Sequence, residues 1–88
     1  MPTICEFFGI KITVNFNDHN PPHFHAKYAD KEALFDIRTL GILRGTVPPR
    51  VAGLIVEWGL DHQDELNTAW QQARDGKEPT KIQPPKGA

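Results

Sequence analysis

The stretch of this chain best suited to chemistry runs from Asp18 to Ala26 and has the sequence Asp-His-Asn-Pro-Pro-His-Phe-His-Ala. It contains three of the four histidines, and two prolines restrict the backbone in front of the last two. Histidine changes its charge near neutral pH and is the commonest metal ligand in proteins. Proton transfer or metal binding is therefore expected here before anywhere else in the chain.

Residues 23–28 alternate imidazole or ammonium groups with apolar groups. Successive side chains of a β-strand point to opposite faces, so His23, His25 and Lys27 are predicted to share one face. Two histidines separated by one residue on a strand have Cα atoms roughly 6.5 Å apart. Their rings can converge on one ligand or ion.

A metal site is one hypothesis for these histidines. His23 and His25, with Asp18, His19 or Asp36 as a third ligand, offer nitrogen and oxygen donors that suit Zn, Ni, Mn or Fe. The sequence does not require a divalent metal, because a purely structural loop is the alternative. In that case Asp18 caps backbone amides and the histidines hold the strand ends together.

Period-two patterning predicts the strands that position this stretch. The clearest strand is 10–17, where four apolar residues alternate with four polar ones. Residues 4–8 are short and apolar, residues 33–38 form the strand after the histidines, and 42–44 could add a short fourth strand.

Matching the apolar faces predicts how the histidine strand pairs with the next one. If Tyr28 opposes Ala33, then His25 opposes Asp36 on the other face. Directly opposed residues have Cβ atoms about 5 Å apart. The register therefore predicts a contact between His25 and Asp36.

Acid–base catalysis is a second hypothesis for the same face. Asp36 would orient the imidazole of His25 and leave its other nitrogen free for proton transfer. The predicted register also puts His23 opposite Arg38, and Arg38 or Lys11 could stabilise a phosphate or oxyanion. Metal-independent RNA cleavage needs this combination, since a hydroxyl must be deprotonated beside a stabilised phosphorane.

The C-terminal half predicts one long amphipathic helix. Apolar groups recur every three or four residues over 50–74, Pro49 suits the first turn, and Gly76 is a stop signal. Gly53 and Gly59 each cost about 1 kcal/mol relative to alanine in a helix. The main alternative is therefore a bend or break near Gly59–His62.

These elements predict an α+β fold with a three- to four-stranded antiparallel sheet, one face of which is covered by the long helix. Residues 1–76 are expected to form a single domain, followed by a Pro- and Lys-rich tail at 77–88. The other face of the sheet is polar and uncovered in this arrangement. It could receive a substrate, a second subunit or a partner protein.

Composition limits the classes of function. The net charge of −1 gives no general attraction to nucleic acid or anionic membranes. Cys5 is the sole cysteine, which excludes a disulfide framework, and Glu6 interrupts the early apolar residues before a signal peptide could form. No apolar run approaches the roughly 20 residues that cross a bilayer. A cytoplasmic protein is expected.

Several motifs along the chain occur together in a known family: Met1-Pro2-Thr3-Ile4, Gly9-Ile10, Asp18-His19, Pro21-Pro22-His23-Phe24-His25-Ala26, Pro48-Pro49-Arg50, Glu57-Trp58, His62, Glu65-Leu66 and Trp70. With them the chain resembles the bacterial family called domain of unknown function 4160. The resemblance implies a small stand-alone protein from gene neighbourhoods of toxin–antitoxin type. It supplies no catalytic residues. Cys5-Glu6 and the glycines at 53 and 59 depart from the usual pattern of the family.

Two functions follow as hypotheses. The first is a small interaction or regulatory module of a toxin–antitoxin-like pair, which binds a protein partner or another copy of itself through the sheet face or an edge strand. The alternative is an RNase-like phosphodiester-cleaving enzyme or a metal-dependent hydrolase that uses His23, His25 and Asp36. RNA binding gains no support from the net charge, and a membrane role is not expected.

Overall fold

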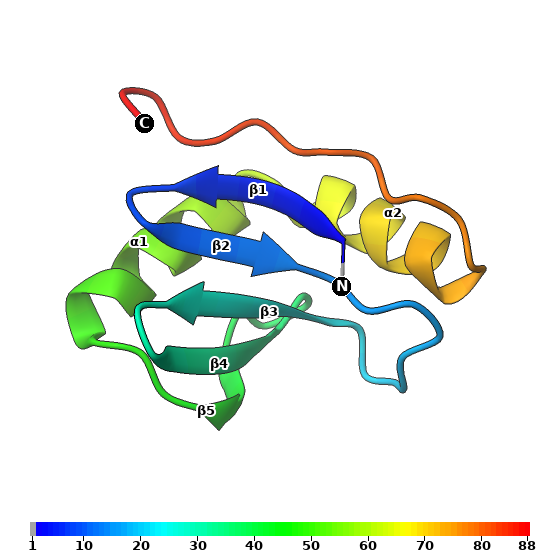
Figure 1. Cartoon of the computed structure of the whole chain (residues 1–88), viewed down its shortest axis with the longest axis horizontal. Helices are drawn as coiled ribbons and strands as arrows, with labels where there is room; N and C mark the ends of the chain where they lie inside the picture. Colours follow the sequence, from blue (N-terminus) through cyan, green and yellow to red (C-terminus); the bar gives the residue numbers. More distant parts are fainter. Residues whose placement is uncertain (1) are drawn as a thin grey trace.

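The computed structural model describes residues 2–88. In this part of the chain five strands precede two helices (Figure 1). The elements are β1 (Thr3–Phe7), β2 (Ile10–Thr13), β3 (His23–Tyr28), β4 (Lys31–Asp36), β5 (Ile42–Gly45), α1 (Pro49–Leu60) and α2 (Gln63–Arg74).

The strands form one antiparallel sheet in the order β1-β2-β3-β4-β5, so each strand pairs with its neighbour in sequence. The α+β class is confirmed, but the described residues form five strands instead of three or four. Both β1 and β5 are full members of the sheet. A two-residue turn at Phe8 and Gly9, with φ of 51° and 79°, connects β1 to β2, and turns of this kind match the twist of a hairpin.

The prediction of one long helix is wrong, and its alternative describes the structure. The helix breaks at Asp61 and His62, where the φ of His62 is −133°. Gln63 then anchors the start of α2, because its Nε2 donates to the carbonyl oxygens of Ile37 and Arg38 at 2.9 and 3.0 Å.

Neither of the two helices in residues 2–88 has the length and apolar character that a membrane-spanning helix needs.

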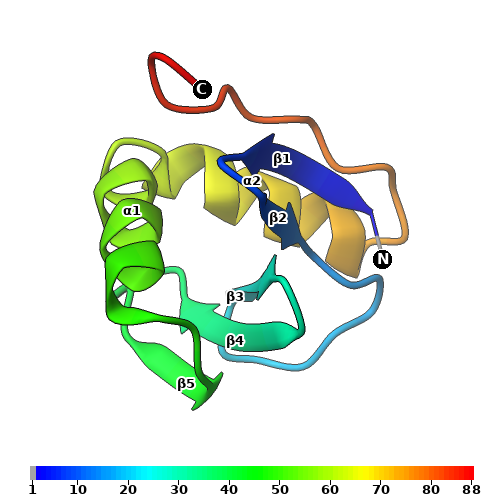
Figure 2. The same cartoon turned by 60° about the vertical axis from the view of Figure 1, so that its left-hand side comes forward.

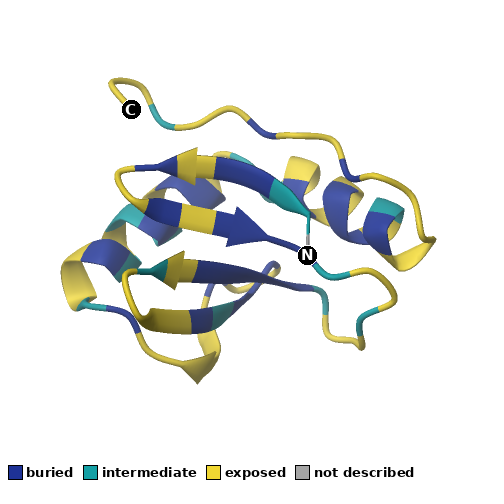
Figure 3. Ribbon diagram, viewed as in Figure 1, coloured by how far each residue is buried: buried dark blue, intermediate teal, exposed yellow. Residues whose placement is uncertain are grey.

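The break lets each helix bury its own apolar stripe against the sheet, and both lie on the same side of it (Figures 1 and 2). Trp58 of α1 packs against Phe7 and Phe24, with ring centroids 5.2 and 6.1 Å apart. Phe24 stacks on Phe35 of the next strand at 5.4 Å. Each such side chain contributes about 1.5–3 kcal/mol by burial. Figure 3 shows that β3, in the middle of the sheet, is buried over most of its length.

The tail at 77–88 runs beside the outer edge of β1 (Figure 1). The amide of Ile82 donates to the carbonyl of Ile4 at 2.8 Å, and Ile82 is buried. The indole Nε1 of Trp58 donates to the carbonyl of Gln83 at 2.9 Å. The tail therefore covers an edge that could otherwise pair with another chain.

Cys5 lies on β1 and is buried. Burial raises the pKa of its thiol to about 11, and the nearby Glu6 carboxylate also raises it, although a backbone hydrogen bond at Glu6 lowers it. Because only the thiolate reacts, iodoacetamide at pH 8 is expected to modify the native protein about 100-fold more slowly than the protein in guanidinium chloride. Mass spectrometry over time measures this, and equal rates in the two conditions would contradict the burial of the thiol.

Candidate metal centre

The predicted register between the histidine strand and the next strand is wrong by two residues. His23 opposes Asp36, and His25 opposes Leu34. The cause is the length of the turn, because Tyr28 pairs with Lys31 across a two-residue turn instead of with a later residue. A shift of two residues preserves the alternation of faces, so both histidines keep the predicted side of the sheet.

Asp36 therefore does not contact His25 and has a structural task. Its Oδ1 accepts the backbone amides of Arg38 and Thr39 at 2.7 and 3.1 Å. These bonds close the turn that follows β4. Arg38 is exposed. Lys11 pairs with Lys27, two residues after His25 on β3, and so does not lie directly opposite His25. The proposed catalytic pair of His25 and Asp36 is not formed.

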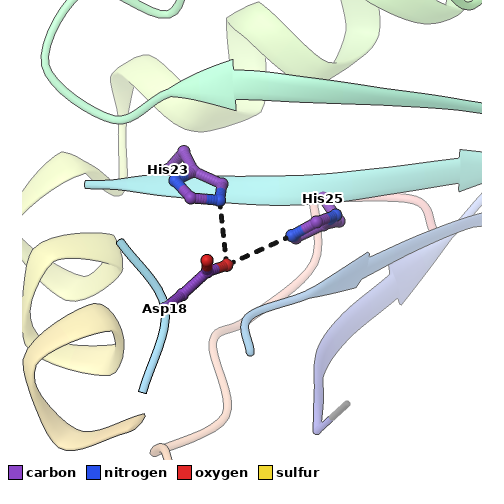
Figure 4. Close-up of side chains that lie close together, drawn as sticks. All are labelled: Asp18, His23 and His25. Carbon is purple, nitrogen blue, oxygen red and sulfur yellow. Dashed lines mark ion pairs between the residues drawn. The ribbon is translucent and has the colours of Figure 1, made fainter. Parts of the chain in front are cut away.

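The carboxylate beside the two histidines is that of Asp18, not that of Asp36 as the predicted register indicates. One potential ligand atom from each of Asp18, His23 and His25 lies within 4.8 Å of the other two. The Oδ2 of Asp18 is 3.0 Å from the Nε2 of His23 and 3.6 Å from the Nε2 of His25 (Figure 4). The ring of His19 is outside this group, and its backbone amide donates to Asp18 Oδ1 at 2.8 Å.

The hydrogen bonds of the two rings fix their neutral tautomers. The Nδ1 of His23 lies 2.8 Å from the carbonyl oxygen of Pro21, and the Nδ1 of His25 lies 3.2 Å from Oε2 of Glu32. A carbonyl and a carboxylate can only accept, so each Nδ1 carries the hydrogen. In a neutral imidazole the Nε2 atom is then a bare lone pair. With both rings neutral, two lone pairs therefore face the carboxylate of Asp18; with the rings protonated, the Nε2–H groups point at it instead.

Three electron-rich atoms this close repel one another unless a positive charge joins them, either protons or a metal ion. Metal-bound histidines commonly donate the other ring N–H to a carbonyl or a carboxylate, as His23 and His25 do here. Two imidazoles and one carboxylate match the ligands of catalytic zinc and non-haem iron sites. The side-chain amide of Asn15 also donates to His25 Nε2 at 3.2 Å, so an ion on this nitrogen must displace that contact.

The charge of Asp18 suits the role of a ligand. Desolvation raises the pKa of its carboxyl, but the hydrogen bond from the His19 amide outweighs this effect together with the positive charges of the His23 and His25 imidazolium rings and a hydrogen bond from His25. The pKa of Asp18 therefore lies below its usual value, and the group is a carboxylate at neutral pH.

The face around the histidines is less open than the sequence predicts. His23 and His25 are 7% and 9% exposed, because the loop that contains Asp18 folds over them and the ring of Trp70 lies 5.0 Å from that of His23. The amide of Asn17 donates to the carbonyl of Ala73 at 3.2 Å, which ties this loop to α2. The loop, whose Asn20–Pro21 peptide is cis, is thus held on both sides.

The cluster opens into a depression of about 370 Å³. It is lined by Asn15, Asp18, His19, Asn20, Pro21, His23, His25, Leu34, Leu43 and Arg44. Sequence reasoning missed Glu32 and Arg44. Glu32 could have been found from a two-residue turn, since that register puts it opposite Lys27 and diagonal to His25.

The fold and the cluster define a small α+β protein with two histidines and one carboxylate gathered at one end of a sheet. The chain belongs to the family described as domain of unknown function (DUF4160), whose model matches residues 9–71. The matched region includes Asp18, His23 and His25. No curated protein and no solved structure shows significant similarity to the chain.

Proposed function

We propose that the protein binds one divalent transition-metal ion through Asp18, His23 and His25 and uses it to hydrolyse an ester bond. The observation that carries the proposal is the orientation of the two imidazoles. Each places its Nδ1 at hydrogen-bond distance from an acceptor and directs its Nε2 at the same carboxylate oxygen.

Three protein ligands suit a hydrolytic centre because they leave a coordination position for water. A bound ion would supply an activated water at neutral pH. The chain itself orients the ligands through Pro21 and Glu32, and the depression gives a substrate access from the solvent side. Asp36, which the sequence had offered as a catalytic group, has no part in this proposal.

A metal titration tests the proposal. The untagged protein is stripped with a chelator, dialysed and titrated with Co²⁺, and visible absorption follows the ion into a site with nitrogen and oxygen ligands. Zn²⁺ is then added as a competitor. We expect saturation at one ion per chain and metal-dependent hydrolysis of activated esters. Failure to bind Co²⁺ or Zn²⁺ saturably would overturn the proposal.

A partner-binding module of a toxin–antitoxin-like pair is the second candidate. It is favoured by β5, an edge strand on which Ile42 and Leu43 are 46% and 48% exposed. Exposed apolar residues at a sheet edge are typical of surfaces that bind another protein. Under this hypothesis His25→Ala leaves partner binding intact, whereas substitutions of Ile42 weaken it.

Glu32→Gln separates the role of the charge from that of the ring geometry. Glutamine can still accept the Nδ1 hydrogen of His25, but it places no negative charge beside the ring. We expect about 10-fold weaker Zn²⁺ binding, at the lower end of the effects of such outer partners. Competition with a chromophoric chelator measures it. Glu6→Gln, on the surface of β1, is the matched control and should bind as wild type; equal affinities in all three proteins would exclude a role for Glu32.

A further inference from the structure

We propose that the substrate of this centre is a phosphodiester attached to an apolar group, as in a nucleotide chain, and that Arg44 binds its phosphate. The inference rests on the proposed metal function and adds a substrate class and two specificity residues, Arg44 and Leu43. It comes from the geometry of β5, which the metal site itself does not use.

A β-bulge directs both residues into the depression. Leu34 of β4 pairs with Arg44, whereas Phe35 pairs with Ile42, so Leu43 is the extra residue of β5. Bulges re-aim side chains and are enriched beside active sites. Here Leu43 and Arg44 both line the depression that contains the histidines.

The distance across the sheet suits a phosphate. His25, Leu34 and Arg44 occupy one row on three adjacent strands. Neighbouring strands are about 4.8 Å apart, so the Cα atoms of His25 and Arg44 are separated by roughly 10 Å. Because His25 and Arg44 both line the depression, an ion at the Nε2 of His25 and the guanidinium of Arg44 would lie on opposite sides of a gap that a phosphate can enter. A phosphate between them would meet a cation on each side.

The rest of the lining indicates what the phosphate is attached to. Arg44 is the one Lys or Arg side chain among the lining residues described, and it stands beside the apolar side chains of Leu34 and Leu43. Leu43 is 48% exposed although it is apolar. A cation next to exposed apolar surface fits a ligand that carries an anionic group and a flat apolar group side by side. Guanidinium forms paired hydrogen bonds with phosphate.

The reaction is a hydrolysis and needs no co-reactant besides water. The oxygen of a water molecule forms a bond to phosphorus, and one phosphorus–oxygen ester bond breaks. The departing oxygen takes up a proton, and the other product is a phosphate monoester.

The test uses the Zn²⁺-loaded full chain with two chromogenic substrates, bis(p-nitrophenyl) phosphate and the neutral ester p-nitrophenyl acetate. We expect Arg44→Ala to raise KM for the phosphodiester by about 10-fold or more, since hydrogen bonds to charged groups are strong. The rate with the acetate ester and the Zn²⁺ affinity should not change. Arg44→Lys should restore part of the phosphodiester KM, and Arg38→Ala, also exposed, should match wild type.

The outcomes separate this inference from the proposed function. Two results would overturn the phosphodiester assignment and leave the metal centre standing. In the first, the wild-type protein binds Zn²⁺ but hydrolyses the acetate ester alone. In the second, Arg44→Ala loses the same fraction of its activity on both substrates. Absence of Zn²⁺ binding would overturn both. A dinucleoside monophosphate is the third substrate. Leu43→Ser should raise its KM without affecting hydrolysis of the acetate ester, and an unchanged KM would remove Leu43 from the proposal.

Discussion

The His25→Ala variant is expected to lose the thermal stabilisation that Zn²⁺ gives to the wild-type protein. A ligand that binds the native state alone stabilises it by about 2.7 kcal/mol at a free concentration 100-fold above Kd. For a domain of this size each kcal/mol raises Tm by about 4–8 °C, so wild type should gain roughly 10–20 °C. Removing an imidazole ligand should weaken binding by more than about 100-fold, beyond the effect of outer-shell partners. The variant should then show almost no shift at the same Zn²⁺ concentration.

Differential scanning calorimetry with and without Zn²⁺ measures this, and the comparison within one variant cancels any change in apo stability. His19→Ala is the matched control, because this histidine lines the same depression but lies outside the ligand group. It should retain the full shift. A Zn²⁺-induced shift in His25→Ala as large as that in wild type would show that the ion binds elsewhere.

The faces of the sheet were predictable from the sequence, whereas the partners across it were not. Alternation of polar and apolar residues placed His23 and His25 on one side, and the structure keeps them there. The register depends on the length of the turn after Tyr28. A turn that ends at Asp30 puts the same residues on each face of the sheet as a turn that ends two residues later. Periodicity could not distinguish these two registers, so it could not show that Leu34, not Asp36, opposes His25.

The part that the loop containing Asp18 plays in the site was only partly predictable from the sequence. Asp18 precedes the two prolines and was one of several ligand candidates, but its approach to the histidines depends on contacts far apart in sequence. The amide of Asn17 binds the carbonyl of Ala73, and the amide of Ile37 binds that of Pro22 at 3.0 Å. No local pattern encodes these distant pairs. Glu32 was missed for another reason, the wrong length of the turn after Tyr28, and Arg44 because its place depends on the bulge in β5.

The helix break illustrates a competition between local and tertiary effects. The spacing of apolar residues continues through Gly59 to Gln63 without interruption and favours one helix. The tertiary structure has two, since each helix buries its own apolar stripe. Gly59 also lets α1 approach Leu40, because an added Cβ there would lie 3.0 Å from the Cδ2 of Leu40. The glycine predicted the place of the break, and the packing decided that it occurs.

Gly45→Ala is expected to be among the most destabilising single substitutions in this protein. Gly45 has a φ of +80°, and an added Cβ would lie 2.2 Å from the carbonyl oxygen of Glu32. That oxygen also accepts the amide of Thr46 at 3.1 Å, so the backbone cannot move away without losing a hydrogen bond. A left-handed alanine costs about 1–2 kcal/mol, and relieving the clash adds to it. We expect a total loss above about 3 kcal/mol in urea unfolding.

Two other glycines separate the clash from the backbone conformation. Gly76 has a φ of +77° with no atom within 4 Å of an added Cβ, so Gly76→Ala should cost only about 1–2 kcal/mol. Gly53 lies within α1, and an added Cβ there also meets nothing within 4 Å, so Gly53→Ala should stabilise the protein by about 1 kcal/mol. The free energy of unfolding is therefore expected to rise in Gly53→Ala, fall moderately in Gly76→Ala and fall most in Gly45→Ala. Equal losses at Gly45 and Gly76 would mean that β5 can retreat from β4, and Arg44 would then have no fixed place beside the histidines.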